Sequence, residues 1–276
     1  MKSHLAVYDL ATRSYQDLLI RDGLFEAPNW TPDGQTLIVN SNGLLYRVPQ
    51  AAPALIPIDT GFATRLNNDH GIAPDGSRLI ICDKTEHGKS SIYWLPLCGG
   101  TPQPVTAWQP SWWHGWSPDG TMIAYAAQRG TDPTIQIYTC PLAGGAETCL
   151  TRGFTHCDGP DYSPDGQWIW FNGERDGAMQ LWRMHPDGSR LMPMTQDERV
   201  NWFPHPAPDG QHVLYLSYEP GTSGHPAGLP VQLRLLAADG GEPEVLANIR
   251  GGQGSINTPC WAPDSRHFAF CHYPEL

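Results

Sequence analysis

Basic residues are scarce in this sequence. The 276 residues include 17 lysines and arginines against 28 aspartates and glutamates, which gives a net charge of −11 at pH 7. No cluster of basic side chains interleaves with aromatic ones, so attraction to a polyphosphate backbone is not expected. The composition therefore argues against nucleic acid as a partner.

Long apolar runs are also absent. The chain passes from one lysine directly into a strand-like alternation at residues 4–9, without the apolar stretch that an export signal or a membrane span needs. The sequence thus predicts no membrane partner and a cytoplasmic protein. The periplasm would be the compartment if a leader had been removed from the chain.

Several familiar sequence signatures are missing. The seven cysteines are an odd set without a Cys-x-x-Cys spacing, which favours small buried thiols in a reducing compartment over a disulfide framework. The sequence has no Gly-x-Ser-x-Gly elbow, His-Glu-x-x-His motif, phosphate-binding glycine loop or Gly-x-Gly-x-x-Gly fingerprint. Serine-peptidase, zincin, kinase and dinucleotide-binding functions therefore lose their usual support.

A short phrase built on Pro-Asp recurs six times along the chain. Its prolines are Pro32, Pro74, Pro118, Pro164, Pro208 and Pro263, so the phrase returns after 42, 44, 46, 44 and 55 residues. This spacing is typical of the four-stranded blades of a β-propeller. In the phrase, proline fixes the first turn position, aspartate caps the turn backbone and glycine accepts a positive φ.

A β-rich run follows every phrase. These runs are Thr36–Asn40, Arg78–Cys82, Met122–Ala126, Trp168–Phe171, His212–Leu216 and His267–Cys271. The last phrase has only one such run after it, whereas the N-terminus offers two, His4–Asp9 and Tyr15–Ile20. We therefore predict an all-β, six-bladed propeller that forms one domain over residues 1–276, with a last blade closed by N-terminal and C-terminal strands.

The Trp-Ser-Pro-Asp-Gly phrase at Trp116 and its spacing resemble the TolB-type, WD40-like six-bladed β-propellers over essentially the whole chain. That family resemblance includes Tol-system scaffolds, propeller parts of peptidases and a lyase of oligogalacturonate. The weaker resemblance to the lyase type implies a divalent ion (Mn, Zn or Ca) on the propeller axis, held by three histidines and a glutamine. By residue type and location, this sequence offers His70, His114, His205 and Gln253 for such a site.

The segments before the phrases are expected to line the central channel, because the first strand of each blade faces the propeller axis. Histidines occur in four of the six segments, together with several aspartates. We predict His114, Asp158 and Asp69 as catalytic residues. The predicted substrate-binding residues are Asn68, Trp112, Trp113, Asp161, Trp202, Phe203, His225 and Asn257.

Two functions remain open from the sequence. In the first, the channel binds a small molecule or sugar and the protein is a carbohydrate-active enzyme of the lyase or hydrolase type, with or without a divalent metal. In the second, the propeller is a non-catalytic scaffold that binds a protein or a glycan. Channel histidines that only hydrogen-bond to backbone or water would fit the second function.

Overall fold

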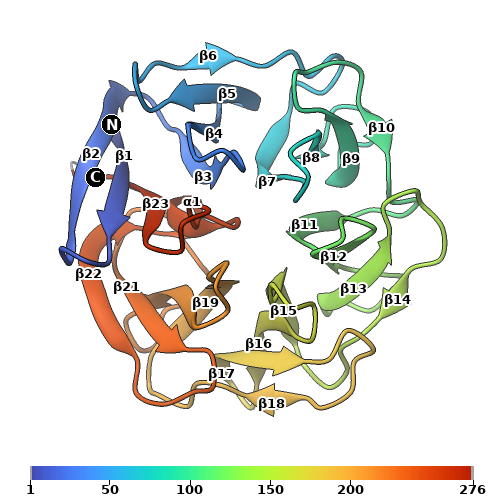
Figure 1. Cartoon of the computed structure of the whole chain (residues 1–276). Coiled ribbons are helices and arrows are strands. Elements are labelled where there is room, and N and C mark those ends of the chain that lie inside the picture. The colour runs from blue at the N-terminus through green and yellow to red at the C-terminus, as the bar shows by residue number, and fades with distance from the viewer. Residues whose placement is uncertain (1, 275–276) are drawn as a thin grey trace.

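The computed structural model describes residues 2–274, and its strands form six sheets arranged around a central axis (Figure 1). Five sheets have four antiparallel strands each, and the sixth has three in the order β2-β1-β23. The predicted all-β, six-bladed propeller is therefore confirmed.

The first five blades follow one another along the chain. The first blade comprises β3 (Glu26–Trp30), β4 (Thr36–Ser41), β5 (Leu44–Pro49) and β6 (Ile56–Pro57). The second comprises β7 (Leu66–Ile72), β8 (Arg78–Asp83), β9 (Ser91–Pro96) and β10 (Gln103–Pro104). The third comprises β11 (Ser111–Trp116), β12 (Met122–Ala127), β13 (Gln136–Pro141) and β14 (Thr148–Cys149). The fourth comprises β15 (His156–Tyr162), β16 (Ile169–Arg175), β17 (Ala178–Met184) and β18 (Met192–Pro193). The fifth comprises β19 (Val200–Pro206), β20 (His212–Tyr218), β21 (Leu229–Ala237) and β22 (Glu244–Gly251).

The closing blade joins both ends of the chain, as the sequence predicts. Its strands are β23 (His267–His272), β1 (Lys2–Asp9) and β2 (Ser14–Asp22). Strand β1 pairs with β23 from His4 opposite His272 to Asp9 opposite His267. This pairing protects strand edges that would otherwise be exposed at the two ends of the chain.

The inner element of the closing blade differs from the prediction. The segment before the last phrase was expected to form a first strand like the other five. The structure instead has the one-turn helix α1 (Gln253–Ile256) and a single bridge between Trp261 and Phe268. The backbone lies close to its neighbours here, since a Cβ on Gly254 would be 2.2 Å from Glu26 Oε1. Glycine therefore allows the helix to pack against the first blade inside the ring.

The Pro-Asp phrases form the turns that the sequence predicts. In the first phrase, Asp33 Oδ1 accepts a hydrogen bond from the backbone N–H of Gln35 at 3.0 Å, and Gly34 has a φ of 67°. The corresponding aspartates of the other phrases accept the same bond, from Ser77, Thr121, Gln167, Gln211 and Arg266. A tryptophan at the start of three of the phrases is buried between blades. These residues are Trp30, Trp116 and Trp261.

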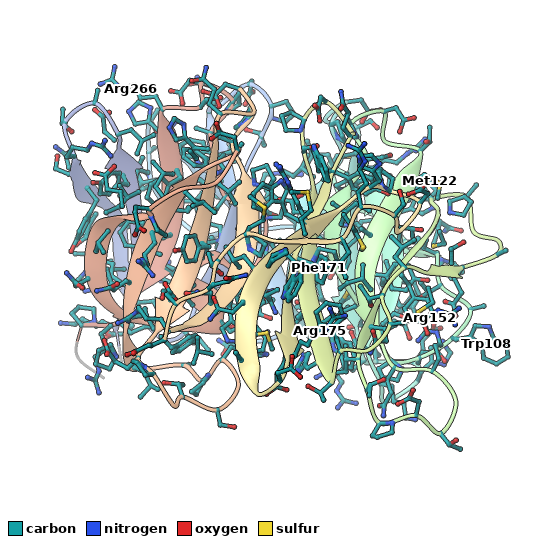
Figure 2. All side chains as sticks on the ribbon, turned by 90° about the horizontal axis from the view of Figure 1, so that it is seen from below. Trp108, Met122, Arg152, Phe171, Arg175 and Arg266 are labelled. Atoms are coloured by element: carbon teal, nitrogen blue, oxygen red, sulfur yellow. The ribbon has the colours of Figure 1, made fainter. Side chains whose placement is uncertain are left out.

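The two faces of the ring carry different loops. Figure 2 shows Met122 and Arg266, which follow Pro-Asp phrases, toward one face, and Arg175, Arg152 and Trp108 toward the other. We call the second face the Arg175 face. Within residues 2–274, no helix is long and apolar enough to cross a membrane.

Candidate functional site

A β-bulge interrupts the inner strand of every blade from the first to the fifth. The pairing shifts register between residues 26 and 29, 66 and 70, 113 and 115, 158 and 161, and 202 and 205. Ala27, Gly159 and Phe203 have positive φ values of 55°, 57° and 54° within three of these bulges. Because a bulge redirects side chains, it turns the polar residues of these strands toward the axis.

Asp158 and His114 form a buried ion pair between the fourth and third blades. His114 Nε2 lies 2.9 Å from Asp158 Oδ1 and 4.0 Å from Asp69 Oδ1. His114 Nδ1 lies 3.2 Å from the carbonyl oxygen of Asn257. A carbonyl and a carboxylate only accept hydrogen bonds, so both ring nitrogens of His114 carry hydrogens and the imidazole is charged.

The charges of this pair stabilise each other. Burial opposes ionisation of both groups, but the opposite charge and hydrogen bond raise the pKa of His114 and hold the pKa of Asp158 well below its usual range. Asp69 has no comparably close cation, and burial raises its pKa despite the attraction of His114. The three residues predicted to be catalytic therefore lie close together, and their pKa values are shifted in ways that favour charged His114 and Asp158 over charged Asp69.

Helix α1 anchors the polar residues on the axis. Asn257, which follows α1, donates a hydrogen bond of 2.7 Å to Asp69 Oδ1 and one of 3.2 Å to the carbonyl of Asn68. His205 Nε2 lies 2.6 Å from the carbonyl oxygen of Ile256. The closing blade is thereby tied to the second, third and fifth blades across the ring.

Asp161 and His205 form a second buried pair. His205 Nδ1 lies 3.1 Å from Asp161 Oδ2, and the side chain of His205 is fully buried. Burial raises the pKa of Asp161, and His205 opposes that effect. Nε2 of His205 donates a hydrogen bond to the Ile256 carbonyl, and Nδ1 faces Asp161. Both ring nitrogens of His205 therefore already have a partner within the protein.

The predicted three-histidine ion site does not fit this arrangement. Both ring nitrogens of His114 and of His205 are held by protein oxygens, so neither ring offers a lone pair without rearrangement. Within residues 2–274, His70, His114 and His205 do not form a group of ligand atoms lying within 4.8 Å of one another. The fourth predicted ligand, Gln253, begins α1 and is half-buried.

Two further histidines, His156 and His225, lie near Asp158 Oδ2, the carboxylate oxygen that is not bonded to His114. Oδ2 is 3.9 Å from His156 Nε2 and 3.8 Å from His225 Nε2, and the three side chains are 11%, 29% and 25% exposed, respectively. The ring of Trp202 contacts both imidazoles edge-on, at centroid distances of 5.5 and 4.5 Å. We call Asp158, His156, His225 and Trp202 the mouth cluster.

The mouth cluster opens on the Arg175 face of the ring. His156 lies opposite Glu174 in the pairing of β15 with β16. The next residue, Arg175, lies toward that face in Figure 2. A cavity of about 550 Å³ there is lined by His156, Trp202, Arg199 and residues 221–224 of the loop between β20 and β21. A larger cavity of about 680 Å³ lies elsewhere, over the Pro-Asp turns of the first and closing blades, and none of its lining residues belongs to the mouth cluster.

The pKa values of the two mouth histidines move in opposite directions. Burial lowers the pKa of His225, with the Asp158 charge only partly opposing it. For His156, the nearby carboxylate of Asp158 outweighs burial and raises the pKa. The same carboxylate thus lies between one imidazole that favours the neutral form and one that favours the charged form.

Two further titratable groups are the half-buried Glu26 of the first blade and the buried His70 of the second blade. Burial raises the pKa of Glu26 to about 7, with a hydrogen bond to Asn40 opposing it and the charge of Asp69 adding to it. Burial lowers the pKa of His70 to about 4, so this ring is neutral at pH 7. His70 is a predicted metal ligand, and the structure places it in a wholly buried position.

The aromatic residues that are predicted to bind substrate are mostly buried. Trp113 is 0% exposed and packs over Gly71, where a Cβ would be 2.0 Å from its ring. It fills the core between the second and third blades and offers no face to a ligand, which corrects the prediction for this residue. Phe203 is also 0% exposed and stacks at 6.0 Å on His114, while Trp112 is half-buried.

The sequence analysis missed Glu26 and His156 as site residues. His156 carried a usable signal, since it lies in one of the four histidine-bearing segments before the phrases. Glu26 also lies in the segment before the first phrase, but its contact with α1 from the other end of the chain has no local signal. Asn68 and Asn257, which are predicted to bind substrate, lie in the polar network, and Asp161 joins it through His205.

Comparisons with known proteins agree with the fold and the repeat. The family model of the TolB β-propeller domain, PD40, matches residues 110–228. An uncharacterized protein of Agrobacterium fabrum is 48% identical over 274 residues, which cover 99% of this chain and 93% of the relative. A solved structure from Agrobacterium tumefaciens, provisionally called TolB, has 47% identity and a TM-score of 0.97, and the match covers 100% of this chain and 99% of that one.

The chain belongs to the TolB-type, PD40-repeat β-propeller family. The Tol-Pal system protein TolB of Francisella tularensis is 23% identical over 88% of this chain, which spans about half (55%) of that relative's length. A gluconolactonase from Xanthomonas campestris shares the fold, with 17% identity and a TM-score of 0.59 over 73% of this chain and 71% of that one. Family membership establishes the propeller and leaves the chemistry of the mouth cluster to be argued from its geometry.

Proposed function

We propose that this TolB-like propeller binds a small polyhydroxylated molecule at the mouth cluster and acts on it by acid–base chemistry of the hydrolase or lyase type. The observation that carries the proposal is the position of Asp158 Oδ2 between two imidazoles at 3.9 and 3.8 Å. Of this cluster, His156 and Trp202 line a cavity of about 550 Å³. These separations exceed a direct hydrogen bond, and they let one ligand hydroxyl bridge Oδ2 and an imidazole nitrogen from the side.

The opposite pKa shifts of His225 and His156 support a division of the two proton-transfer roles. His225 favours the neutral form and is the proposed base, which takes a proton from the substrate or from water. His156 favours the charged form and is the proposed acid, which gives a proton to the leaving oxygen. Asp158 accepts hydrogen bonds from ligand hydroxyls and holds His156 charged.

The predicted catalytic residues His114 and Asp69 take a positioning role in this proposal. His114 fixes Oδ1 of Asp158 through its 2.9 Å bond, and Asn257 fixes both His114 and Asp69. Oδ2 of Asp158 therefore points to the mouth in a defined direction. No step of the proposed reaction passes through a metal ion in the channel.

Turnover of sugars by matched histidine variants tests the proposal. We expect the wild type to convert a member of a panel of uronate oligosaccharides, neutral oligosaccharides and sugar lactones, followed by NMR. His225→Ala should lower turnover by about 100-fold or more, as loss of a general base does. His87→Ala, at an exposed histidine outside the cluster, is the control. Full activity of His225→Ala, or no conversion of any panel member, would contradict the proposal.

A second candidate function is binding of a protein partner. Trp108 is 65% exposed and lies at the outer rim of the ring, toward the Arg175 face, in Figure 2. It borders a cavity of about 550 Å³ that Pro110 and Arg129 also line. Exposed tryptophans are enriched among residues that dominate protein interfaces. The test is cross-linking in cells of the source organism: a specific partner captured by the wild type and lost in Trp108→Ala supports this function, and equal capture opposes it.

The cysteines bear on the cellular compartment of the protein. All seven cysteines are free, and Cys98 is exposed. Free exposed thiols persist in a reducing environment. We propose the cytoplasm on this ground, with the periplasm as the alternative, and fractionation of cells that produce the full-length protein distinguishes them.

A further inference from the structure

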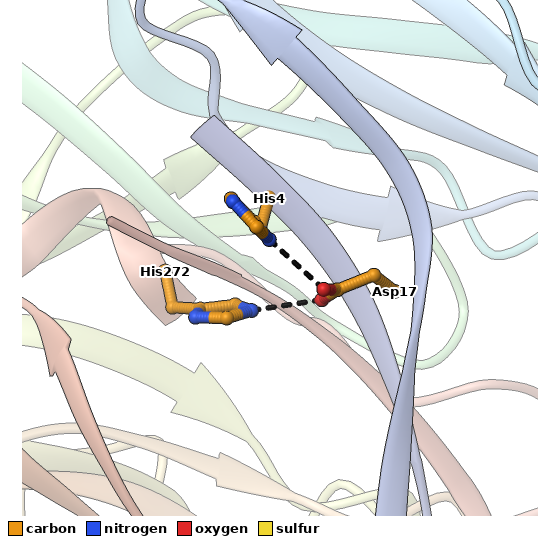
Figure 3. A group of neighbouring side chains, drawn as sticks. All are labelled: His4, Asp17 and His272. Carbon is orange, nitrogen blue, oxygen red and sulfur yellow. Dashed lines mark hydrogen bonds and ion pairs between the residues drawn. The ribbon is translucent and has the colours of Figure 1, made fainter. Parts of the chain in front are cut away.

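A second group of histidine and aspartate side chains lies outside the channel, on the closing blade. Figure 3 shows His4 of β1, Asp17 of β2 and His272 of β23 pointing toward one another. His4 Nδ1 is 2.9 Å from Asp17 Oδ2, and His272 Nε2 is 2.8 Å from Asp17 Oδ1. One potential ligand atom from each residue lies within 4.8 Å of the other two.

The register of the sheet places these three side chains on one face. His4 pairs directly with His272 across β1 and β23. Asp17 pairs with Ala6, two residues from His4, so it projects on the same side. Ala6 also pairs with Phe270, and its methyl group leaves room for Asp17 to reach across β1 toward β23.

The surroundings orient the rings and leave one side open. The side chains of His4, Asp17 and His272 are 13%, 28% and 9% exposed. The rings of Tyr15 and Phe270 lie 5.5 and 5.6 Å from the His272 ring. Aromatic packing therefore limits rotation of His272, while the Asp17 side of the group remains accessible from solvent.

We propose that His4, Asp17 and His272 bind one Zn²⁺ ion, with water in the fourth position. Two imidazole nitrogens and one carboxylate oxygen are the donor set that Zn²⁺ accepts, whereas Mg²⁺ and Ca²⁺ prefer oxygen alone. The ion replaces the two direct hydrogen bonds of Asp17 and requires a small outward shift of the carboxylate to reach bond lengths of about 2.0–2.2 Å.

Such an ion would join three strands from opposite ends of the chain. Its ligands are separated by up to 268 positions in the sequence (272 minus 4) and lie on adjacent strands of a single sheet. Zn²⁺ binds the assembled group better than the unfolded chain, so it stabilises the folded state. The metal would therefore add to the stability of the closing blade, independently of the proposed mouth chemistry.

Zinc titration of the whole, EDTA-treated chain without a histidine tag tests the proposal. We expect calorimetry to find one Zn²⁺ per chain and the melting temperature to rise with Zn²⁺. At a free Zn²⁺ concentration of 100 times Kd, the folding equilibrium constant should rise about 100-fold. Co²⁺, used as a spectroscopic probe, should show the visible absorption of a low-coordinate nitrogen and oxygen site.

Matched variants separate this site from other histidines. Asp17→Asn and His272→Gln should lose Zn²⁺ uptake, and His4→Gln offers a milder substitution at a more exposed ligand. His267→Gln is the control, because His267 lies on the same strand and pairs with Asp264 at 2.6 Å but has no second histidine beside it. His225→Ala should also keep the uptake, which distinguishes this site from the mouth cluster.

Three results would overturn the proposal. The first is a wild-type chain that binds no Zn²⁺ at micromolar concentrations, in which case Asp17 only accepts hydrogen bonds from two imidazoles. The second is undiminished uptake by folded Asp17→Asn and His272→Gln, with folding checked by circular dichroism. The third is loss of uptake in His225→Ala, which would move the ion to the channel.

Discussion

Asp158 and Asp17 each lie between imidazole rings, and their surroundings differ. The side chain of Asp158 is 11% exposed and its bonded partner His114 comes from another blade. Asp17 is 28% exposed, and its two partners come from the same sheet. A buried carboxylate held by a charged partner is fixed in position, whereas a more open one can move to meet a cation. Aspartate and histidine thus hold one another in position in the channel, whereas on the closing blade we propose that they bind a metal ion from solvent.

The largest effect is expected from breaking the buried pair. Asp158→Asn leaves the His114 imidazolium without its counter-charge in the channel, and loss of one partner of a buried pair typically costs about 4 kcal/mol. The free energy of unfolding from urea titration measures the change. Asp264→Asn is the control, because its pair with His267 is half exposed and should contribute less than about 1 kcal/mol. Equal losses in the two variants would contradict the contrast between buried and open pairs.

The same contrast applies to glycines. Gly71→Ala would place a Cβ 2.0 Å from the Trp113 ring, which is rigid and fully buried, and we expect a loss of about 3 kcal/mol. Gly130→Ala meets no atom within 4 Å and only has to adopt a φ of 62°, so a loss of about 1 kcal/mol is expected. Thermal unfolding compares the two. A Gly130 variant as unstable as the Gly71 variant would mean that backbone strain, not packing, dominates.

Glu26 extends the comparison to a half-buried carboxylate without a cation beside it. Its pKa is raised to about 7 in the folded protein against 4.5 as the usual value, so the folded state holds more protons than the unfolded state between these pH values. Stability from this group is therefore present below pH 4.5 and is lost as pH rises to 7. The expected loss is about 2 to 3 kcal/mol.

The test of Glu26 is the difference in unfolding free energy between wild type and Glu26→Gln from pH 4.5 to 8. A difference is needed because His70, with a pKa lowered to about 4, acts with the opposite sign and loses stability as pH falls from 6.5. Glu242→Gln, at an exposed position, should follow the wild type. Parallel profiles for Glu26→Gln and wild type would refute the raised pKa.

Local patterns were sufficient to predict the blades. The run expected at Thr36–Asn40 is β4 (Thr36–Ser41), and the run at His267–Cys271 is β23 (His267–His272). Turn chemistry and alternation are local properties, so the sequence carries them directly. Closure of the ring by His4–Asp9 was also predictable, because incomplete strand counts at the two ends complement each other.

The site could be predicted only in outline, because its details depend on long-range packing. Position in the repeat identified Asp158, His114 and Asp69 as neighbours. Burial of Trp113 depends on Gly71 in the preceding blade, and no local sequence pattern indicates that these two residues are in contact. The raised pKa of Glu26 likewise depends on burial that is completed by α1 from the far end of the chain.

The smallest effect is expected at Asp17, and it should depend on metal. In EDTA, Asp17→Asn keeps hydrogen-bonding capacity toward His4 and His272, so we expect a loss of about 1 kcal/mol or less for this partly exposed group. In excess Zn²⁺ the gap between wild type and variant should widen, because only the wild type gains stability from binding. Melting curves in EDTA and in Zn²⁺ give both values. A gap that is already large in EDTA would place Asp17 with Asp158 as a structural anchor, and a gap that Zn²⁺ leaves unchanged would remove the functional difference between the two carboxylates.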